Sequence, residues 1–431
     1  MTPAFDEHRP PAPELINQCV HCGFCLPACP TYVLWGNEMD SPRGRIYLMK
    51  TASEGATAMT DAWVRHFDTC LGCMSCMTAC PSGVDYAKLI EATRAQIERR
   101  HPRSQSERWR RRMIFATFPR VDRLRLLRAG LRVYQRSGLQ FLVRASGLLR
   151  FFPKALQAME GLMPELGPRE VIPAFTPAQG PKRKRVGLLL GCVQRELLPG
   201  INAATARVLA AEGCEVVAPP DQPCCGALMV HAGEEAPALD LARRMIEVFE
   251  RAEVDAIITN AGGCGSNVRE YVYQLRDDPQ YSDRAARFSE KCRDITEFLE
   301  EIGARARRKP LNLRVAYHDS CHLQHAQRVR AQPRAQLSTI PSLEILELPE
   351  AALCCGSAGI YNLVQPETAD ALAERKAQHI GAAKPDIVAT GNIGCLLQMA
   401  AALKRQGTTT RVVHTVQLID ASIRGIPPAG V

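Results

Sequence analysis

One cysteine spacing occurs twice near the amino terminus and constrains this chain more than any other feature. The two copies are Cys19-x2-Cys22-x2-Cys25-x3-Cys29-Pro30 and Cys70-x2-Cys73-x2-Cys76-x3-Cys80-Pro81. This spacing is typical of proteins that bind a pair of [4Fe–4S] clusters, because three cysteines of each run ligate one cluster and the fourth ligates the other. The expected ligand sets are Cys19, Cys22, Cys25 and Cys80 for one cluster, and Cys70, Cys73, Cys76 and Cys29 for the other.

Disulfide bonds and zinc sites are the alternatives for so many cysteines. Disulfides persist in oxidising compartments, and the amino-terminal sequence MTPAFDEHRPPAPEL lacks the basic-then-apolar pattern of a signal peptide. Zinc sites usually combine two Cys-x2-Cys pairs, not an unbroken run of four cysteines with a trailing proline. The doubled run therefore favours two [4Fe–4S] clusters and a cytoplasmic protein.

Composition agrees with a globular protein of two or three domains. Hydrophobic residues make up 46% and charged residues 23% of the 431 positions, which is ordinary for such a protein. No run approaches 18 uncharged apolar residues, so no membrane-spanning helix is expected.

Positive charge is concentrated in one segment. Residues Arg94–Arg150 contain sixteen arginines, no lysine and three acidic residues, which gives +13 here and leaves −4 for the rest of a chain of +9. Apolar residues recur at helical spacing between Ile114 and Leu127, which predicts helices. These helices present either a solvated basic face or a docking surface for an anionic membrane or an acidic partner. Nucleic acid is not an expected partner, because no binding module is recognised.

Arginines also follow the first cysteine run, in Ser41-Pro42-Arg43-Gly44-Arg45. One interpretation places them beside the clusters, where they would offset negative charge. The other is a turn with solvated arginines before a helix over residues 46–52. The sequence leaves both open.

A second cysteine pattern occurs in two later copies. Each copy has an apolar strand before a single cysteine, a strand before Cys-Cys-Gly, and a strand before a further cysteine. The first copy has strands at 186–190, 215–218 and 256–260, with Cys192, Cys224, Cys225 and Cys264; the second has strands at 315–318, 343–348 and 386–390, with Cys321, Cys354, Cys355 and Cys395. Corresponding intervals differ by one residue, and each copy closes with a similar tail, at 294–299 and 414–419. The pattern is an internal repeat.

Alternating strands and helices predict βαβ units and a parallel sheet in each copy. Since ligands of parallel sheets lie beyond the carboxyl ends of the strands, the four thiols of each copy should converge there on a further cluster or redox site. The neighbouring glycines are expected to let backbone and inorganic sulfur approach closely. The alternative is buried structural cysteine, which is the expected role of Cys214 and Cys292 outside both patterns.

The expected fold class is α/β with a small α-helical ferredoxin-like module. We predict a dicluster module at 1–92, a basic helical segment and linker at 93–181, and two tandem Rossmann-like domains, the first half at 182–303 and the second half at 311–425. Proline-rich residues 164–181 are the predicted linker.

Together these motifs resemble the iron–sulfur subunit of glycolate oxidase (glycolate dehydrogenase). Related families are the iron–sulfur subunits of lactate-utilisation and anaerobic glycerol-3-phosphate dehydrogenase complexes, and the Cys-Cys-Gly subunit of heterodisulfide reductase. Short sequence motifs resemble those of the glycolate branch of the family. They are His21-Cys22-Gly23-Phe24-Cys25, Cys29-Pro30-Thr31-Tyr32, Leu323-Gln324-His325-Ala326-Gln327 and Cys354-Cys355-Gly356-Ser357-Ala358-Gly359.

The resemblance implies an electron-transfer subunit of an oxidoreductase that acts on CH–OH donors. Flavoprotein partner subunits would take electrons from glycolate or a similar 2-hydroxyacid, and this subunit would relay them to a membrane acceptor such as quinone, with peripheral contact to the membrane. The chain has no Gly-x-Gly-x-x-Gly fingerprint, so FAD is expected on the partners alone.

The alternative is a terminal reductase of the heterodisulfide reductase type, or the equivalent subunit of a lactate or glycerol-3-phosphate complex. One departure weakens the reductase interpretation. Heterodisulfide reductase-type domains end in Cys-x2-Cys, whereas each copy here ends in a single cysteine, Cys264 or Cys395. The three histidines around Cys321 are candidate donors to a cluster or acceptor, or structural residues: His318, His322 and His325.

Overall fold

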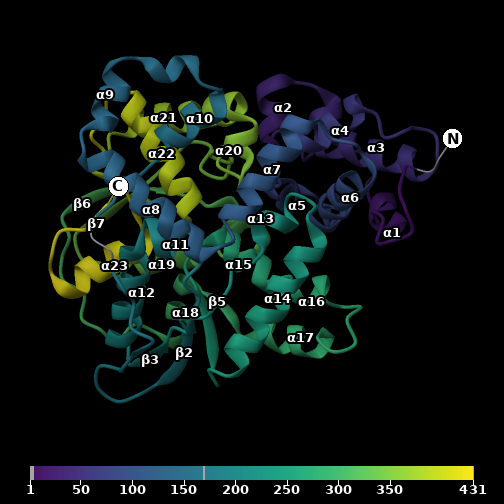
Figure 1. Ribbon diagram of the computed structural model, residues 1–431. Helices are drawn as coiled ribbons and strands as arrows, with labels where there is room; N and C mark the ends of the chain where they lie inside the picture. Colours follow the sequence, from purple (N-terminus) through teal and green to yellow (C-terminus); the bar gives the residue numbers. More distant parts are fainter. Residues whose placement is uncertain (1–3, 168–169, 431) are drawn as a thin grey trace.

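The computed structural model describes residues 4–167 and 170–430. Figure 1 shows the dicluster module at one end of the molecule, the two α/β halves packed against each other, and a helical segment that runs from the module along both halves. Within the described ranges, no helix is both long enough and apolar enough to cross a bilayer.

The dicluster module consists of short helices joined by the cysteine runs. Its elements are α1 (Pro13–Asn17), α2 (Pro30–Trp35), η1 (Glu38–Asp40), α3 (Pro42–Ser53), α4 (Asp61–Asp68), α5 (Ser75–Ala79) and α6 (Tyr86–Arg100). Pro30 begins α2 directly after Cys29, as the fixed φ and missing N–H of proline favour. The helix expected over 46–52 begins earlier, at Pro42, because the Ser41 side chain caps it by accepting from the Gly44 N–H.

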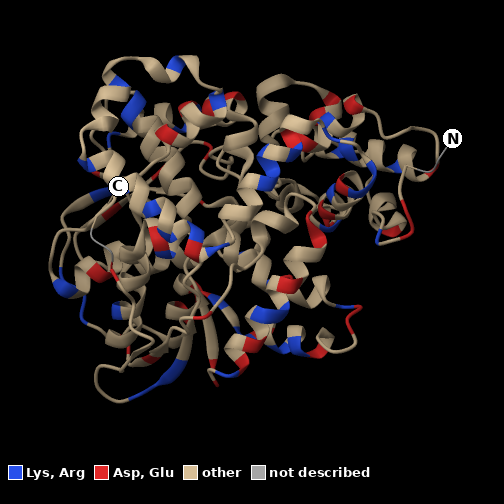
Figure 2. Cartoon of the chain, in the orientation of Figure 1, with Lys and Arg blue, Asp and Glu red and all other residues tan. Residues whose placement is uncertain are grey.

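The basic segment is helical, as predicted. It contains α7 (Gln105–Thr117), α8 (Val121–Arg136), α9 (Leu139–Ala145), η2 (Leu148–Phe151) and α10 (Lys154–Gly161). Figure 2 shows basic residues along these helices. The interpretation that these arginines form a solvated face is wrong for part of the segment. Arg111 and Arg128 are buried, and Arg103 pairs with Asp68 and Glu107.

Each half is built on a mainly parallel sheet. The first half contains β1 (Phe175–Thr176), β2 (Lys184–Leu188), α11 (Val193–Leu197), α12 (Pro199–Ala211), β3 (Cys214–Val217), α13 (Ala227–Val230), α14 (Glu235–Glu250), β4 (Ala256–Thr259), α15 (Gly262–Arg269), α16 (Tyr271–Gln274), α17 (Ser282–Lys291), β5 (Cys292–Asp294) and α18 (Ile295–Ile302). The second contains β6 (Leu313–His318), the π-helical turn η3 (His322–Ala326), α19 (Ala331–Ser338), β7 (Leu343–Glu347), α20 (Tyr361–Val364), α21 (Pro366–Ala383), β8 (Ile387–Thr390), α22 (Ile393–Arg405), β9 (Arg411–His414) and α23 (Thr415–Arg424).

The two sheets share one strand order. The first is β1-β3-β2-β4-β5 and the second is β7-β6-β8-β9, so β2, β3, β4 and β5 correspond to β6, β7, β8 and β9. The extra strand β1 is antiparallel to β3 and lies inside the predicted linker. The α/β class with parallel sheets is confirmed, while the Rossmann-like description and the domain boundaries remain predictions.

The repeated tails begin the last helix of each half. Asp294 caps α18 and His414 caps α23, and in both cases the third helical residue, Glu297 or Gln417, bonds back to the cap. This is a capping box, which satisfies two of the free N–H groups at a helix start.

One apolar core joins the halves. It combines residues of both sheets and their covering helices, among them Val186, Val208, Phe298, Val315 and Val388. Helix α12 packs on α23, and α18 packs on α19. Because α12 corresponds to α19 and α18 to α23, the contacts are reciprocal, as in a two-fold dimer interface.

Candidate iron–sulfur sites

The structure gathers the predicted ligands of the first cluster around one small cavity. Its lining includes Cys19, Cys22, Cys25 and Cys80, and Cys76 of the second run reaches the same cavity. All eighteen cysteines of the chain are free thiols, with Cys22 exposed. Cys80 of the second run thus lies beside three cysteines of the first run, a grouping that the predicted crossed ligand sets require.

The ligands predicted for the second cluster are more deeply placed. Cys70, Cys73 and Cys76 are buried, and so is Cys29 of the first run. Burial raises the pKa of the Cys76 thiol, and the neighbouring Cys73, Cys70 and Cys29 raise it further. Burial raises the pKa of the Cys73 thiol to about 12. A free thiol there is protonated at neutral pH, so metal binding must release its proton.

A buried arginine, Arg45, and a half-buried one, Arg94, lie beside this second group. The Arg45 side chain is 1% exposed and donates to the His66 carbonyl, to Thr31 and to Thr69. Burial alone would raise the pKa of Cys70, but the positive charges of Arg45 and Arg94 hold it below its usual value. The sequence allowed the arginines of Ser41–Arg45 to lie either beside the clusters or in solvent. For Arg45, the structure supports a position beside the cysteines.

Arg43 lies nearer the surface, beside the first cysteine run. Its guanidinium donates to the His21 carbonyl and to Glu38. Its charge also acts to lower the pKa of Cys19, although burial is the larger effect and raises it.

The second cysteine run touches the second half directly. Leu71 and Cys73 pack in one buried cluster with Cys321, Cys354 and Tyr361. The Tyr361 hydroxyl donates to the Thr69 carbonyl at 3.0 Å. Two cysteine groups that are about 250 positions apart in sequence are therefore neighbours.

The repeated cysteines meet at the carboxyl ends of the strands, as predicted from the repeat. In the first half Cys192 follows β2 and its Sγ lies 3.4 Å from Sγ of Cys224, while Cys225 interacts with Cys264 at the start of α15. In the second half Sγ of Cys321 lies 4.0 Å from Sγ of Cys354. Cys214 and Cys292 are buried in β3 and β5, which confirms their place in the core.

The glycine of each Cys-Cys-Gly sequence has a backbone role. Gly226 and Gly356 have φ of +83° and +87°, a left-handed conformation that favours glycine. A Cβ at Gly356 would lie 2.5 Å from the Ala369 carbonyl oxygen. At these positions glycine therefore serves the turn geometry and, at Gly356, the close packing on α21, while close approach of inorganic sulfur stays a prediction.

The three histidines near Cys321 have different roles. His322 Nε2 donates to the Gly72 carbonyl at 2.9 Å, and its Nδ1 lies 2.7 Å from Ser266 Oγ. His325 Nδ1 lies 2.7 Å from Thr78 Oγ1. Both histidines thus fasten the second half to the dicluster module, and no motif in the sequence indicates these partners.

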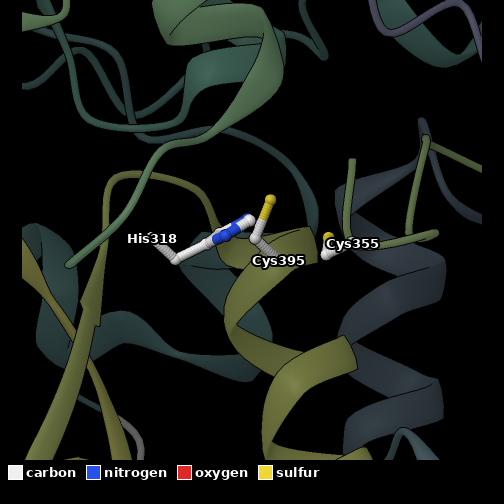
Figure 3. A group of neighbouring side chains, drawn as sticks. All are labelled: His318, Cys355 and Cys395. Atoms are coloured by element: carbon white, nitrogen blue, oxygen red, sulfur yellow. The ribbon is translucent and has the colours of Figure 1, made fainter. Parts of the chain in front are cut away.

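His318 instead points toward cysteine thiols. Its ligand atoms and those of Cys355 and Cys395 all lie within 4.8 Å of one another, and Figure 3 shows the ring directed from the end of β6 toward Cys395 on α22. Burial lowers the pKa of His318, an effect that the Cys395 thiol opposes. A neutral imidazole among thiols is suited to binding a metal.

Both repeated cysteine groups open on one cavity of about 750 Å³. Its remaining wall comes largely from apolar side chains of the helical segment. These include Phe118, Leu124, Leu127, Leu131, Val143, Leu148, Phe152, Leu156 and Met159. The cavity is therefore a space shared by the two halves and the helical segment.

Comparison with known proteins agrees with this organisation. A family model described as the 4Fe-4S dicluster domain matches residues 15–84, and the cysteine-rich domain matches 186–269 and 315–400. The linker region of the glycolate oxidase iron-sulfur subunit matches 106–163. The chain is 41% identical over 415 residues to the probable glycolate oxidase iron-sulfur subunit of Bacillus subtilis, covering 94% of this chain and 93% of that protein. The chain belongs to the glycolate oxidase iron–sulfur subunit family.

Other relatives define the breadth of the family. The glycolate oxidase iron-sulfur subunit of Escherichia coli is 34% identical over 418 residues, covering 96% of this chain and 95% of that protein. Lactate utilization protein A of Oceanobacillus iheyensis is 28% identical over 242 residues, which is 56% of this chain and 98% of that protein. The family membership confirms the resemblance inferred from the motifs and the iron–sulfur character of the cofactors.

The donor set fits such cofactors. Grouped free thiols, a positive guanidinium beside Cys70 and N–H groups aimed at sulfur, such as that of Gly72 toward Cys70 at 3.4 Å, are features that stabilise thiolate-bound clusters.

Proposed function

We propose that this chain is the electron-transfer subunit of a glycolate (2-hydroxyacid) dehydrogenase complex, relaying electrons from flavoprotein partner subunits to a membrane acceptor such as quinone. The packing of Cys73, Cys321 and Cys354 in one buried cluster carries this proposal. It places the buried cysteine group of the dicluster module beside the repeated cysteine group of the second half. Family membership supports the same function.

In this proposal the ligands follow the crossed sets. Cys19, Cys22, Cys25 and Cys80 would hold one [4Fe–4S] cluster, and Cys29, Cys70, Cys73 and Cys76 the other. Four thiols in each half would hold a further cluster: Cys192, Cys224, Cys225 and Cys264, and Cys321, Cys354, Cys355 and Cys395. When bound, such clusters supply reversible one-electron transfer. The chain's own residues position them and exclude water.

The exposed cysteine group is the proposed entry for electrons. Cys22 is exposed, and the adjacent Val20 and Phe24 are each 67% exposed. Exposed apolar side chains beside a redox group suit the docking of a flavoprotein partner, since interface centres are apolar and depleted of charge.

This entry surface can be tested with a single added charge. In the complex purified with its flavoprotein subunits, Val20→Glu should lower glycolate-dependent cluster reduction about tenfold or more, because the buried charge weakens docking. Reduction by dithionite should stay unchanged, and low-temperature electron paramagnetic resonance reports both.

Val171→Glu is the matched control, because Val171 is 71% exposed and lies outside the module. Equal glycolate-dependent reduction in both variants would refute this docking surface. Failure of glycolate to reduce any cluster in the unmodified complex, with L-lactate or glycerol 3-phosphate succeeding, would reassign the substrate.

The cavity is the proposed acceptor end. It brings both repeated cysteine groups together with the apolar wall of the helical segment. An apolar, ring-shaped acceptor such as quinone fits a space of this size and lining.

The outer surface of the same helices supports peripheral membrane contact. Phe141 is 73% and Phe151 is 75% exposed, and exposed arginines such as Arg136 and Arg150 lie between such residues. Apolar and basic side chains on one amphipathic surface favour the interface of an anionic bilayer.

Charge reversal tests this membrane contact. The double variant Arg136→Glu/Arg150→Glu should bind vesicles of anionic phospholipid about 30-fold more weakly, because each arginine contributes about 1 kcal/mol near such a surface. Flotation with vesicles measures the binding. Arg244→Glu/Arg287→Glu, with the same charge change on two exposed arginines of the first half, should bind as the unmodified protein does; equal binding by both double variants contradicts the assignment.

A terminal reductase is the second candidate, and the cavity is the observation that favours it. A space of about 750 Å³ beside the thiols of both halves would also admit a disulfide substrate. Cluster signals that change when a thiol or disulfide is added would support this function, and unaltered signals would exclude it.

A further inference from the structure

The two repeated cysteine groups differ in the residues that surround them. His318 lies three positions before Cys321, and the corresponding position before Cys192 is Leu189, which is also buried. A second difference lies on the following helix. Counted from Ala369 and Ala238, which pack on Gly356 and Gly226, the buried Lys376 of α21 corresponds to Met245 of α14. The second group therefore gains an imidazole and a cation where the first has apolar side chains.

His318 has the features of a side chain that is placed to bind a metal ion. It is 1% exposed, and no nitrogen or oxygen atom of the described residues pairs with either of its ring nitrogens; the group that interacts with the ring is the Cys395 thiol. Buried polar groups in folded proteins are nearly always paired. The other two histidines near Cys321 obey this rule through Gly72, Ser266 and Thr78.

The neighbours of His318 are metal-binding thiols. Sγ of Cys355 and Sγ of Cys395 lie within 4.8 Å of its ring nitrogen and of each other; Figure 3 draws the three side chains. These three side chains come from β6, the loop after β7 and α22, so the packing of the sheet itself brings them together. A metal ion among them would be within reach of the ring nitrogen and of both thiols.

We propose that His318 is a ligand to iron in the second half, beside Cys355 and Cys395 and in place of one of the other two thiolates, so that this half holds an iron–sulfur cluster with mixed nitrogen and thiolate ligands, whereas the first half offers thiolates alone. The inference rests on the proposed function only in requiring a cluster in the second half. Replacement of thiolate by neutral imidazole removes negative charge from a cluster and raises its potential, and Lys376, whose ammonium group donates to the Glu350 carbonyl, adds positive charge nearby.

The test uses the full chain with its clusters and does not depend on enzyme activity. In protein labelled with ¹⁵N-histidine, pulsed electron paramagnetic resonance should show a strongly coupled nitrogen that changes with the label. His318→Leu, which installs the residue of the first half, should abolish this coupling and speed iron loss to a chelator about tenfold. His318→Cys should abolish the coupling, keep the iron content and lower the midpoint potential of one cluster.

Several outcomes separate this inference from the proposed function. Coupling that is absent from the unmodified protein, or that persists in His318→Leu, overturns the inference; if His318→Leu does not fold, His318→Cys gives the same decision. Zinc in place of iron at this site also overturns it. Cys395→Ser with undiminished iron shows that the second half holds no cluster and refutes that part of the proposed function, whereas iron loss in Cys395→Ser without nitrogen coupling refutes only the role of His318.

Discussion

Cys73→Ser is expected to uncouple glycolate oxidation from quinone reduction. Cys73 is the member of the second cysteine run that packs in one buried cluster with Cys321 and Cys354, so serine removes a proposed ligand at the junction of the two redox regions. Loss of hydrogen-bonding neighbours of metal ligands already costs 10- to 100-fold in affinity or activity. Loss of a ligand itself should lower glycolate-dependent quinone reduction about a hundredfold or more.

The same variant should keep the first part of the path. Glycolate should still reduce the cluster proposed for Cys19, Cys22, Cys25 and Cys80, which electron paramagnetic resonance can follow alongside iron analysis. Cys292→Ala, at a buried cysteine of β5 outside both patterns, is the control and should retain iron and activity. Unchanged iron content and quinone reduction in Cys73→Ser would show that Cys73 is a packing residue.

Arg45→Met should destabilise the protein by about 3 kcal/mol, because it removes the buried guanidinium and leaves the buried Asp40 carboxylate with His66 and Thr69 as its partners. Arg45 and Asp40 are 1% and 7% exposed, and Arg45 Nη2 lies 3.5 Å from Asp40 Oδ1. Loss of this charge should also raise the pKa of Cys70, so less iron should be retained. Urea denaturation and iron analysis measure the two effects.

Arg43→Met provides the comparison on the same helix. The Arg43 side chain is 28% exposed and pairs with Glu38, and ion pairs of this kind contribute about 1 kcal/mol or less. Arg45→Met/Asp40→Leu should recover part of the stability, since no carboxylate then remains buried. Equal losses in Arg43→Met and Arg45→Met would contradict the account of a buried charge beside the cysteines.

Local sequence signals predicted much of the fold and of the cysteine groups. Apolar runs before each repeated cysteine indicated the strands β2, β3 and β4 and their counterparts, because a buried parallel strand is a short continuous apolar segment. The same reasoning missed β5 and β9. Strand β5 is the three-residue sequence Cys292-Arg293-Asp294, which is too short and too charged to show such a pattern.

Contacts between distant segments could not be predicted from one sequence. Nothing in the spacing pairs His322 with Gly72 or Cys73 with Cys321, because these contacts depend on how the dicluster module packs on the second half. Strand β1 was hidden in a proline-rich stretch, where two residues pair with β3. In contrast, the difference between Leu189 and His318 is visible once the two copies are aligned, although only the structure gives it chemical meaning.

The reciprocal packing of α12 on α23 and of α18 on α19 has a consequence for cooperativity. The apolar residues of these helices belong to one core that includes both sheets, so separating the halves would expose much of that core to water. Local unfolding of one half would thus remove support from the other, and the two cysteine groups should form and be lost together. The two halves are separate copies in the sequence, but we expect them to fold and unfold as one cooperative unit.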